Sequence, residues 1–139
     1  MKQIKTKRRE VGDLGESLAC KYLENKGFMI IDRNYSRKCG ELDIVASNPL
    51  KRLCFVEVKT KSEVISGFMG NNVKHETSGV RPEDNVHFAK IRRLTRVAQV
   101  YLLEKRVLPE TKWQFDVIVV YLDRVTKRAH IRHLENVIF

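Results

Sequence analysis

Two short segments of the chain carry charged side chains at the spacing of an extended strand. Residues 40–45 read Gly-Glu-Leu-Asp-Ile-Val, and residues 55–60 read Phe-Val-Glu-Val-Lys-Thr. Because successive side chains of a strand point to opposite faces, Glu57 and Lys59 are expected on one face of the second segment. The second segment therefore predicts a strand that presents an acid and an ammonium group side by side.

The same alternation groups Glu41 with Asp43 on one face of the first segment, and Leu42 with Ile44 on the other. If the two strands pair, a carboxylate from each, Asp43 and Glu57, can converge on one point. Two such carboxylates repel each other unless a cation lies between them. Hard oxygen ligands with open positions for water and phosphate favour Mg²⁺ or Mn²⁺, so the pattern predicts a divalent-metal site.

Lys59 would complete this site by reaching the phosphate or the attacking water. In phosphodiester hydrolysis the cation lowers the pKa of a water molecule and offsets charge on the phosphate, while a lysine orients the nucleophile or stabilises the transition state. A Glu-x-Lys pattern on a strand is by itself usually a solvated ion pair worth ~0–1 kcal/mol. The in-register acid Asp43 and a helical acid, Glu16, favour the catalytic interpretation here.

A helix and three strands are predicted to position these groups. Apolar residues recur at helical spacing over residues 11–26, and Gly27 marks the end of that helix. Gly12 and Gly15 fall in or beside the apolar stripe, which predicts close approach of another backbone. Glu16 lies at the edge of the stripe and is expected to face a cleft. Segments rich in β-branched and aromatic residues then predict an antiparallel meander over residues 28–33, 41–46 and 53–60.

The second half of the chain predicts a helix and two further strands. Residues 61–81 have no sustained period and are expected to form a long connection. Pro82 begins a helix that runs to about residue 105. Residues 115–122 are almost continuously apolar, interrupted only by Asp116, which favours a strand buried on both faces and joined to the 53–60 strand by a right-handed parallel crossover. Residues 129–134 would add a more polar edge strand.

The resulting order, αβββαββ, predicts an α/β fold with a mixed β-sheet flanked by helices. We expect this fold to form a single domain over residues 11–139, behind a basic N-terminal arm of residues 1–10. Lys and Arg total 27 against 17 Asp and Glu, a formal net charge of +10. Such a surplus favours a nucleic-acid partner, although solubility alone could also account for it. The side chains expected to contact phosphates are Arg8, Arg9, Lys90, Arg92, Arg93 and Arg96.

Other classes of protein are not indicated. No apolar run approaches the ~20 residues that a membrane span needs, and residues 1–9 lack a secretion signal, so a cytoplasmic protein without a membrane partner is expected. The three cysteines form no C-x-x-C pair and are expected to be reduced thiols. His130 and His133 stand three apart on a predicted strand, on opposite faces, which argues against a histidine metal site.

Asp43 followed by Glu57-Val58-Lys59 on the next strand resembles the PD-(D/E)xK nuclease superfamily, whose core order is αβββαβ. More closely, the chain is similar to the bacterial YraN family, which itself resembles archaeal Holliday-junction resolvases. The motifs that carry the resemblance are Gly15-Glu16, residues 40–46, residues 55–60, residues 90–94 with Tyr101-Leu102, Phe115-Asp116-Val117 and residues 133–136.

This resemblance implies a restriction-endonuclease-like core in which Asp43, Glu57 and the Val58 carbonyl bind Mg²⁺ or Mn²⁺. Lys59 would be the catalytic lysine, and Glu16 a further acid of the resolvase type. The leading hypothesis is a metal-dependent endonuclease that hydrolyses phosphodiester bonds in DNA, with branched or structured DNA as one candidate substrate. The analogy with resolvases leaves a homodimer open. The alternatives are a non-catalytic nucleic-acid-binding module on the same fold, and a basic adaptor for an acidic protein.

Overall fold

A computed structural model describes residues 7–63 and 88–137 of the chain. The described residues form two α-helices and five β-strands. In chain order they are α1 (Lys7–Asn25), β1 (Met29–Arg37), β2 (Gly40–Ser47), β3 (Leu53–Glu63), α3 (Phe88–Glu104), β4 (Trp113–Asp123) and β5 (Ala129–Leu134). This succession confirms the predicted order αβββαββ and the α/β fold class.

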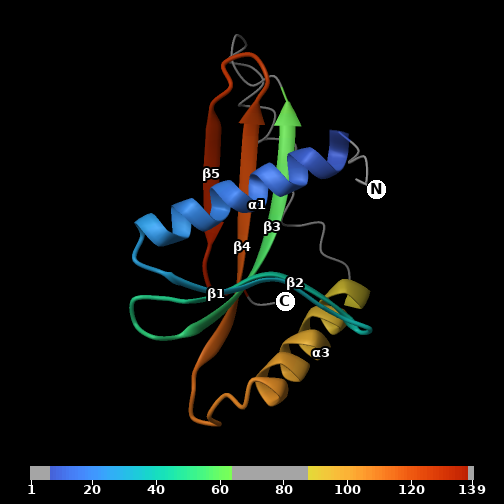
Figure 1. The fold of residues 1–139 in the computed structure, drawn as a ribbon, viewed down its shortest axis with the longest axis vertical. Helices are drawn as coiled ribbons and strands as arrows, with labels where there is room; N and C mark the ends of the chain where they lie inside the picture. Colours follow the sequence, from blue (N-terminus) through green and yellow to red (C-terminus); the bar gives the residue numbers. More distant parts are fainter. Residues whose placement is uncertain (1–6, 64–87, 138–139) are drawn as a thin grey trace, which may run out of the picture.

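The five strands form one mixed sheet in the order β1-β2-β3-β4-β5 (Figure 1). The pairs β1–β2, β2–β3 and β4–β5 are antiparallel, whereas β3 and β4 are parallel. The antiparallel meander and the parallel pairing of the 53–60 and 115–122 segments are therefore confirmed. Four consecutive residues of β4, Val117 to Val120, are at most 1% exposed, as the continuously apolar pattern predicted.

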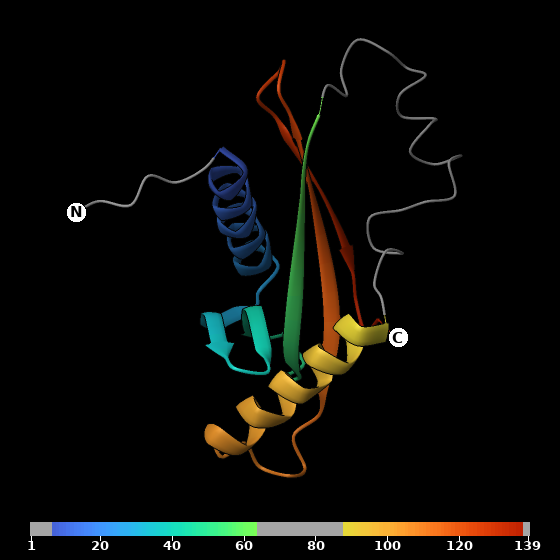
Figure 2. The ribbon, with the colours of Figure 1, turned by 90° about the vertical axis from the view of Figure 1, so that its right-hand side faces the viewer.

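Each helix covers one face of the sheet and builds its own core. Ala19, Cys20 and Leu23 of α1 pack against alternate residues of the strands, among them Ile44, Ala46, Val56 and Ile118. Leu94, Val97, Ala98 and Tyr101 of α3 pack against the intervening residues, including Val45 and Phe55. Figure 2 shows α1 alongside the long strands on one side and α3 crossing their lower end. The sheet thus lies between two apolar layers.

Several elements extend beyond their predicted ends. Helix α1 begins at Lys7, so residues 7–10 of the predicted basic arm are helical, and residues 1–6 lie outside the described part of the chain. The strand expected over residues 28–33 is Met29–Arg37, because its pairing with β2 continues through the polar stretch to Arg37. The predicted connection over residues 61–81 is wrong for residues 61–63, which belong to β3. Its remainder, and the predicted helix start at Pro82, lie outside the described residues.

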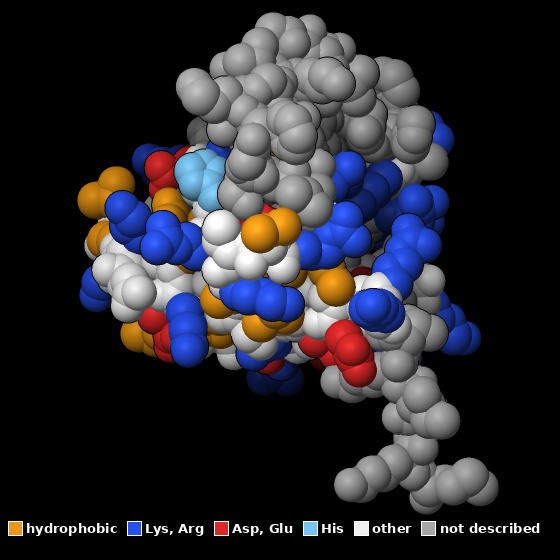
Figure 3. Space-filling model, turned by 90° about the horizontal axis from the view of Figure 1, so that it is seen from above, with side chains coloured by type: hydrophobic (Ala, Val, Ile, Leu, Met, Phe, Trp, Pro, Cys, Tyr) orange, Lys and Arg blue, Asp and Glu red, His pale blue; other side chains and the backbone are white. Residues whose placement is uncertain are grey.

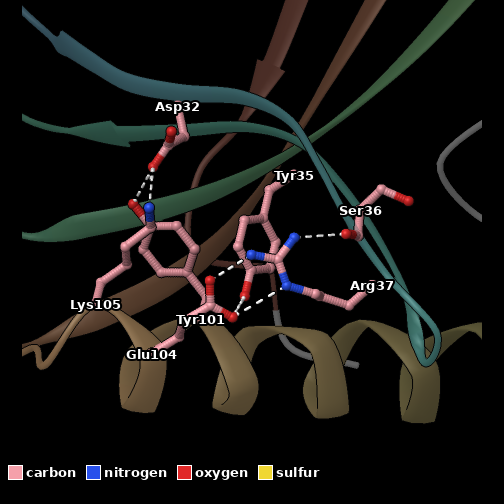
Figure 4. Close-up of polar contacts among 7 residues, drawn as sticks. All are labelled: Asp32, Tyr35, Ser36, Arg37, Tyr101, Glu104 and Lys105. Carbon is pink, nitrogen blue, oxygen red and sulfur yellow. Dashed lines mark hydrogen bonds and ion pairs between the residues drawn. The ribbon is translucent and has the colours of Figure 1, made fainter.

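A polar network fastens the hairpin of β1 and β2 to the last turn of α3 (Figure 4). Glu104 accepts hydrogen bonds from the Tyr35 hydroxyl at 2.9 Å and from Arg37 Nε at 3.0 Å, and it also pairs with Arg37 Nη2. The Tyr101 hydroxyl donates to Asp32 Oδ2 at 2.7 Å. Since β2 carries the segment with Asp43, these contacts hold one wall of the site described below against α3.

Candidate active site

The strands β2 and β3 separate at Asp43. Their antiparallel ladder runs from the Ser47–Leu53 pair to the Ile44–Val56 pair, and beyond it Asp43 would stand opposite Glu57. In place of a backbone partner on β2, the Val58 N–H donates to Asp43 Oδ2 at 2.8 Å. The side chain of Asp43 therefore occupies the fork between the two strands.

The alternation of β2 is interrupted at the same place. Leu42 belongs to the core under α3, whereas Ile44 belongs to the core under α1. The prediction that Leu42 and Ile44 share a face is therefore wrong, because an undisturbed pleat was assumed through a segment where the ladder ends. As a result, Asp43 lines hollows on both the α3 side and the α1 side of the fork.

The hollow on the α3 side is a cleft of about 210 Å³. It is lined by Gly40, Glu41, Asp43, Glu57, Lys90, Arg93 and Leu94. The structure thus brings Asp43 and Glu57 to one cleft, as predicted from the sequence. Burial raises the pKa of Asp43 to about 7, the neighbouring Glu57 carboxylate adds to this shift, and the Val58 hydrogen bond opposes it. Two acids are held close together here at an electrostatic cost.

Two lysines flank these acids. Lys90, near the start of α3, places its Nζ 2.5 Å from Glu57 Oε1. Burial lowers the pKa of Lys59, and the adjacent Lys90 ammonium lowers it further. Lys90 was predicted to contact nucleic-acid phosphates, but its ammonium is engaged by Glu57 in this structure. The sequence could not indicate this pair, because it depends on how α3 crosses the sheet.

Glu16 faces the second hollow, a groove of about 570 Å³ on the α1 side. Its lining comprises Lys7, Arg8, Val11, Gly12, Glu16, Asp43, Val58, Thr60, Ser62 and Arg124. Burial raises the pKa of Glu16, and the Arg33 guanidinium opposes that shift. The prediction that Glu16 faces a cleft is confirmed. Glu57 and Glu16 line different hollows, and Asp43 is the acid that they share.

The packing of α1 on β3 sets the position of Glu16. A Cβ atom built on Gly15 would lie 1.8 Å from Thr60 Oγ1, so glycine is required for this close contact. The predicted close approach is thus to a side chain rather than to a backbone. For Gly12 the prediction of close approach is wrong, since nothing lies within 4 Å of a Cβ built there.

The basic residues predicted to bind nucleic acid fall in different places. Arg93 lines the α3-side cleft, and Arg8 lines the α1-side groove. Arg92 and Arg96 are exposed on α3, and Arg9 is exposed on α1. Seen from the end of the molecule that carries the turn between β4 and β5, Lys and Arg side chains cover much of the described surface (Figure 3). Phosphate contact by these residues stays a prediction.

Asp116, which sequence patterns left without a role, is buried in a second polar cluster. Its Oδ1 accepts hydrogen bonds from Gln114 Nε2 at 2.8 Å and from the Asn136 N–H at 2.9 Å, and its Oδ2 lies 2.8 Å from His133 Nε2. Burial by itself would raise the pKa of Asp116, but these partners hold it below its ordinary value. Asp116, His133 and Glu135 are close enough to share an ion. Since both Asp116 oxygens already have partners, we interpret the cluster as a structural link between β4, β5 and the segment after it.

The fold and this site define an α/β protein with paired carboxylates at the fork of two strands and lysines on either side. Such a group of side chains can hold a divalent cation and a phosphate. The chain belongs to the UPF0102 family: the model described as "Uncharacterised protein family UPF0102" matches residues 15–120. UPF0102 is the YraN family, so this match confirms the family that the sequence motifs indicated.

Related proteins match over nearly their whole length. A UPF0102 protein of Alkaliphilus oremlandii is 40% identical over 130 residues, which cover 92% of this chain and 97% of the relative. One of Desulforamulus reducens is 36% identical over 129 residues, covering 93% and 95%. One of Clostridium botulinum is 30% identical over 128 residues, covering 92% and 93%. Among the described helices, none combines the length and apolar character that a membrane crossing requires.

Proposed function

We propose that this protein is a divalent-metal-dependent endonuclease that hydrolyses phosphodiester bonds in DNA. The observation that carries the proposal is the convergence of Asp43 and Glu57 on one cleft, next to Lys59 and Lys90. A partly buried pair of acids, one of them with a raised pKa, is typical of a functional site. The resemblance of these residues to the PD-(D/E)xK superfamily supports the same chemistry.

The side chains at the fork fit Mg²⁺ or Mn²⁺. Asp43 and Glu57 supply hard oxygen ligands, and a cation between them would offset both the burial and the Glu57 charge that raise the pKa of Asp43. The N–H and C=O groups of one residue in an extended strand point to the same side of that strand. Because the Val58 N–H faces Asp43, we expect the Val58 carbonyl at the same fork, where it would be the third ligand.

Each residue of the site has a distinct task in this reaction. When bound, the cation would supply Lewis-acid stabilisation of the phosphate and activation of the attacking water. Asp43 and Glu57 hold it, and Lys59 contacts a phosphate oxygen or orients the nucleophile. Glu16, across the fork from Glu57, is a further acid for proton transfer. The net charge of +10 favours a polyanionic substrate. Branched DNA, and a homodimer that cuts two strands, follow from the resemblance to resolvases alone.

Cleavage of supercoiled, single-stranded and four-way-junction DNA, with and without Mn²⁺, tests the proposal. We expect the native protein to cleave at least one of these substrates only with the cation. Glu57→Gln and Lys59→Met should each lower the rate by about 100-fold or more, because Glu57 holds the catalytic cation and Lys59 stabilises the transition state or orients the nucleophile. DNA affinity, measured by fluorescence anisotropy, should change far less than the rate.

Matched controls are available on the exposed face of α1. Glu24→Gln and Lys21→Met remove the same charges from exposed positions outside the site, and both should cleave like the native protein. Cleavage that survives in Glu57→Gln would refute the assigned site. Binding of DNA without cleavage under any divalent cation would favour the non-catalytic nucleic-acid-binding module.

A further inference from the structure

Lys90 reaches from the first turn of α3 across the cleft to the acid on β3. Its Nζ lies 2.5 Å from Glu57 Oε1, and the two side chains are only 31% and 15% exposed. An ion pair screened from water to this degree is stronger than a surface pair. Glu57 is therefore neutralised by Lys90. Among the described residues, no cationic side chain contributes to the pKa shift of Asp43.

This contact conflicts with metal binding at the same carboxylate. Oε1, one of the two Glu57 oxygens available to ligate a cation, already accepts from an ammonium group. A divalent cation on this carboxylate would lie close to the Lys90 ammonium and be repelled by it, and Lys59 adds a third positive charge close by. Binding of a divalent ion should therefore displace Lys90 from Glu57.

We propose that Lys90 is an exchangeable counterion of the active site: it neutralises Glu57 in the absence of a divalent cation and, once displaced, binds a phosphate of the substrate. This inference rests on the proposed function. It assigns to Lys90 a competition with the metal, as well as the phosphate contact expected from the sequence.

The surroundings of Lys90 favour this second position. Lys90 is only 31% exposed beside Glu57, so an ammonium group that leaves Glu57 but stays in this cleft needs another anionic partner. The cleft that Lys90 lines also carries Arg93, so a phosphate entering there would meet two cations. A lysine suits this exchange, because its single charge sits on a flexible four-carbon stem. Binding of the metal should consequently raise the affinity for DNA, and binding of DNA should raise the affinity for the metal, because both release Lys90 from Glu57.

The first test measures Mn²⁺ affinity by calorimetry in the absence of DNA. Lys90→Gln should bind Mn²⁺ about tenfold more tightly than the native protein, because the competing ammonium is gone. Arg93→Gln is the matched control, since it removes one positive charge from the same cleft but touches no proposed ligand. It should tighten binding by less than about threefold. Lys90→Arg, which keeps the charge, should stay within about threefold of the native affinity.

The second test measures DNA affinity by fluorescence anisotropy with and without Ca²⁺, a hard cation that prefers oxygen ligands. Without Ca²⁺, Lys90 is held by Glu57, so Lys90→Gln should change DNA affinity by less than about twofold. With Ca²⁺, the same variant should bind about fivefold more weakly than the native protein, because the released ammonium is missing. A merely structural role would weaken DNA binding equally in both conditions.

Glu57→Gln separates failure of this inference from failure of the proposed function. If Glu57→Gln abolishes Mn²⁺ binding but Lys90→Gln leaves it unchanged or weakens it, the role of Lys90 is overturned and the metal site stands. An equal gain in Mn²⁺ affinity in Lys90→Gln and Arg93→Gln would also overturn the role of Lys90, because loss of a positive charge from the cleft would then explain the effect. If the native protein binds no Mn²⁺, the metal site and the inference fail together.

Discussion

Asp43 combines burial with negative neighbours, which is an unfavourable environment for a carboxylate. Its pKa in the folded protein is about 7, against 3.8 for an ordinary aspartate. Above about pH 7 the folded state must hold this charge in a site that resists it, whereas the unfolded state holds it in water. The residue therefore lowers stability under the conditions in which it could bind a cation, as is common for functional groups.

Asp43→Asn should stabilise the protein without metal, and increasingly so as pH rises. Below about pH 4 the aspartate is protonated in both states, so the two proteins should differ little. As pH rises from about 4 to about 7, the native protein loses the stability that the bound proton supplied, and above about pH 7 the variant should be more stable by about 2–4 kcal/mol. The amide oxygen can still accept from the Val58 N–H. Urea unfolding in EDTA at several pH values measures the difference.

Adding Mn²⁺ above about pH 7 should reverse this order, because the cation stabilises only a site with a charged ligand. Glu24→Gln serves as the control for loss of an exposed acid. A stability gain in Asp43→Asn that is the same at every pH, or that Glu24→Gln reproduces, would show that the Asp43 charge is not the cause.

At the scale of the elements, a single glycine, Gly15, allows α1 to pack closely against the sheet. Gly15 lies directly over Thr60 of β3, and the next residue, Glu16, faces the groove that contains Asp43. The close approach of α1 and β3 thus sets how far the helical acid stands from the fork. The hairpin that carries Asp43 is set in turn by the contacts of Tyr35 and Arg37 with Glu104.

Gly15→Ala should move α1 away from β3. The new methyl group would meet the Thr60 side chain, and overpacking of this kind costs about 1–3 kcal/mol. Gly12→Ala is the matched control, since its methyl group would meet nothing within 4 Å, and the better helix propensity should stabilise the protein by about 0.5–1 kcal/mol. Denaturant unfolding of both variants measures these changes.

Thr60→Ala should recover part of the loss in the Gly15→Ala background, because it removes the Oγ1 and Cγ2 atoms in the clash. Equal stability of the two alanine variants would contradict the close packing. If cleavage is present, Gly15→Ala should reduce it more than Gly12→Ala, since only Gly15→Ala displaces Glu16.

How far the sequence predicts this site depends on whether its contacts are local or distant. Strand alternation within Glu57-Val58-Lys59 and helical spacing around Glu16 are local patterns. Glu57 and Glu16 accordingly face hollows, as expected. The split of Leu42 and Ile44 between two cores could not be predicted, because it arises where a ladder ends. The Lys90–Glu57 and Asp116–His133 pairs join separate elements, so their distances depend on the packing of the whole fold.

At the scale of the whole molecule, the dominant property is the excess of positive charge. The net charge of +10 is the difference between 27 basic and 17 acidic residues, and several of the basic residues border the two hollows around Asp43. A partner with regularly spaced phosphates would release its condensed counterions on binding such a surface. Association with DNA should therefore be controlled by salt more than by base sequence.

DNA affinity should fall at least about tenfold between about 50 and 200 mM salt, with a linear dependence of log K on log salt concentration. Fluorescence anisotropy titrations on one duplex at several salt concentrations measure this slope. Arg8→Gln and Arg93→Gln should each reduce the slope by about one if these residues contact phosphates. A slope near zero would contradict a phosphate-binding surface and favour a protein partner.

The fork at Asp43 also leaves part of one edge of β3 without a described partner strand, and such an edge can pair with a strand of another chain. Beyond Val56, no described strand pairs with β3 on its β2 side, so its backbone there could accept an added strand from another chain. The Asp43 carboxylate already occupies the Val58 N–H, and the side chains of Lys59 and Lys61 follow along the same stretch. An incoming strand would have to displace the Asp43 carboxylate and lie against the Lys59 and Lys61 side chains. These three charges should therefore disfavour edge-to-edge pairing with another chain, and neutralising Asp43, Lys59 and Lys61 together should lower the solubility of the protein.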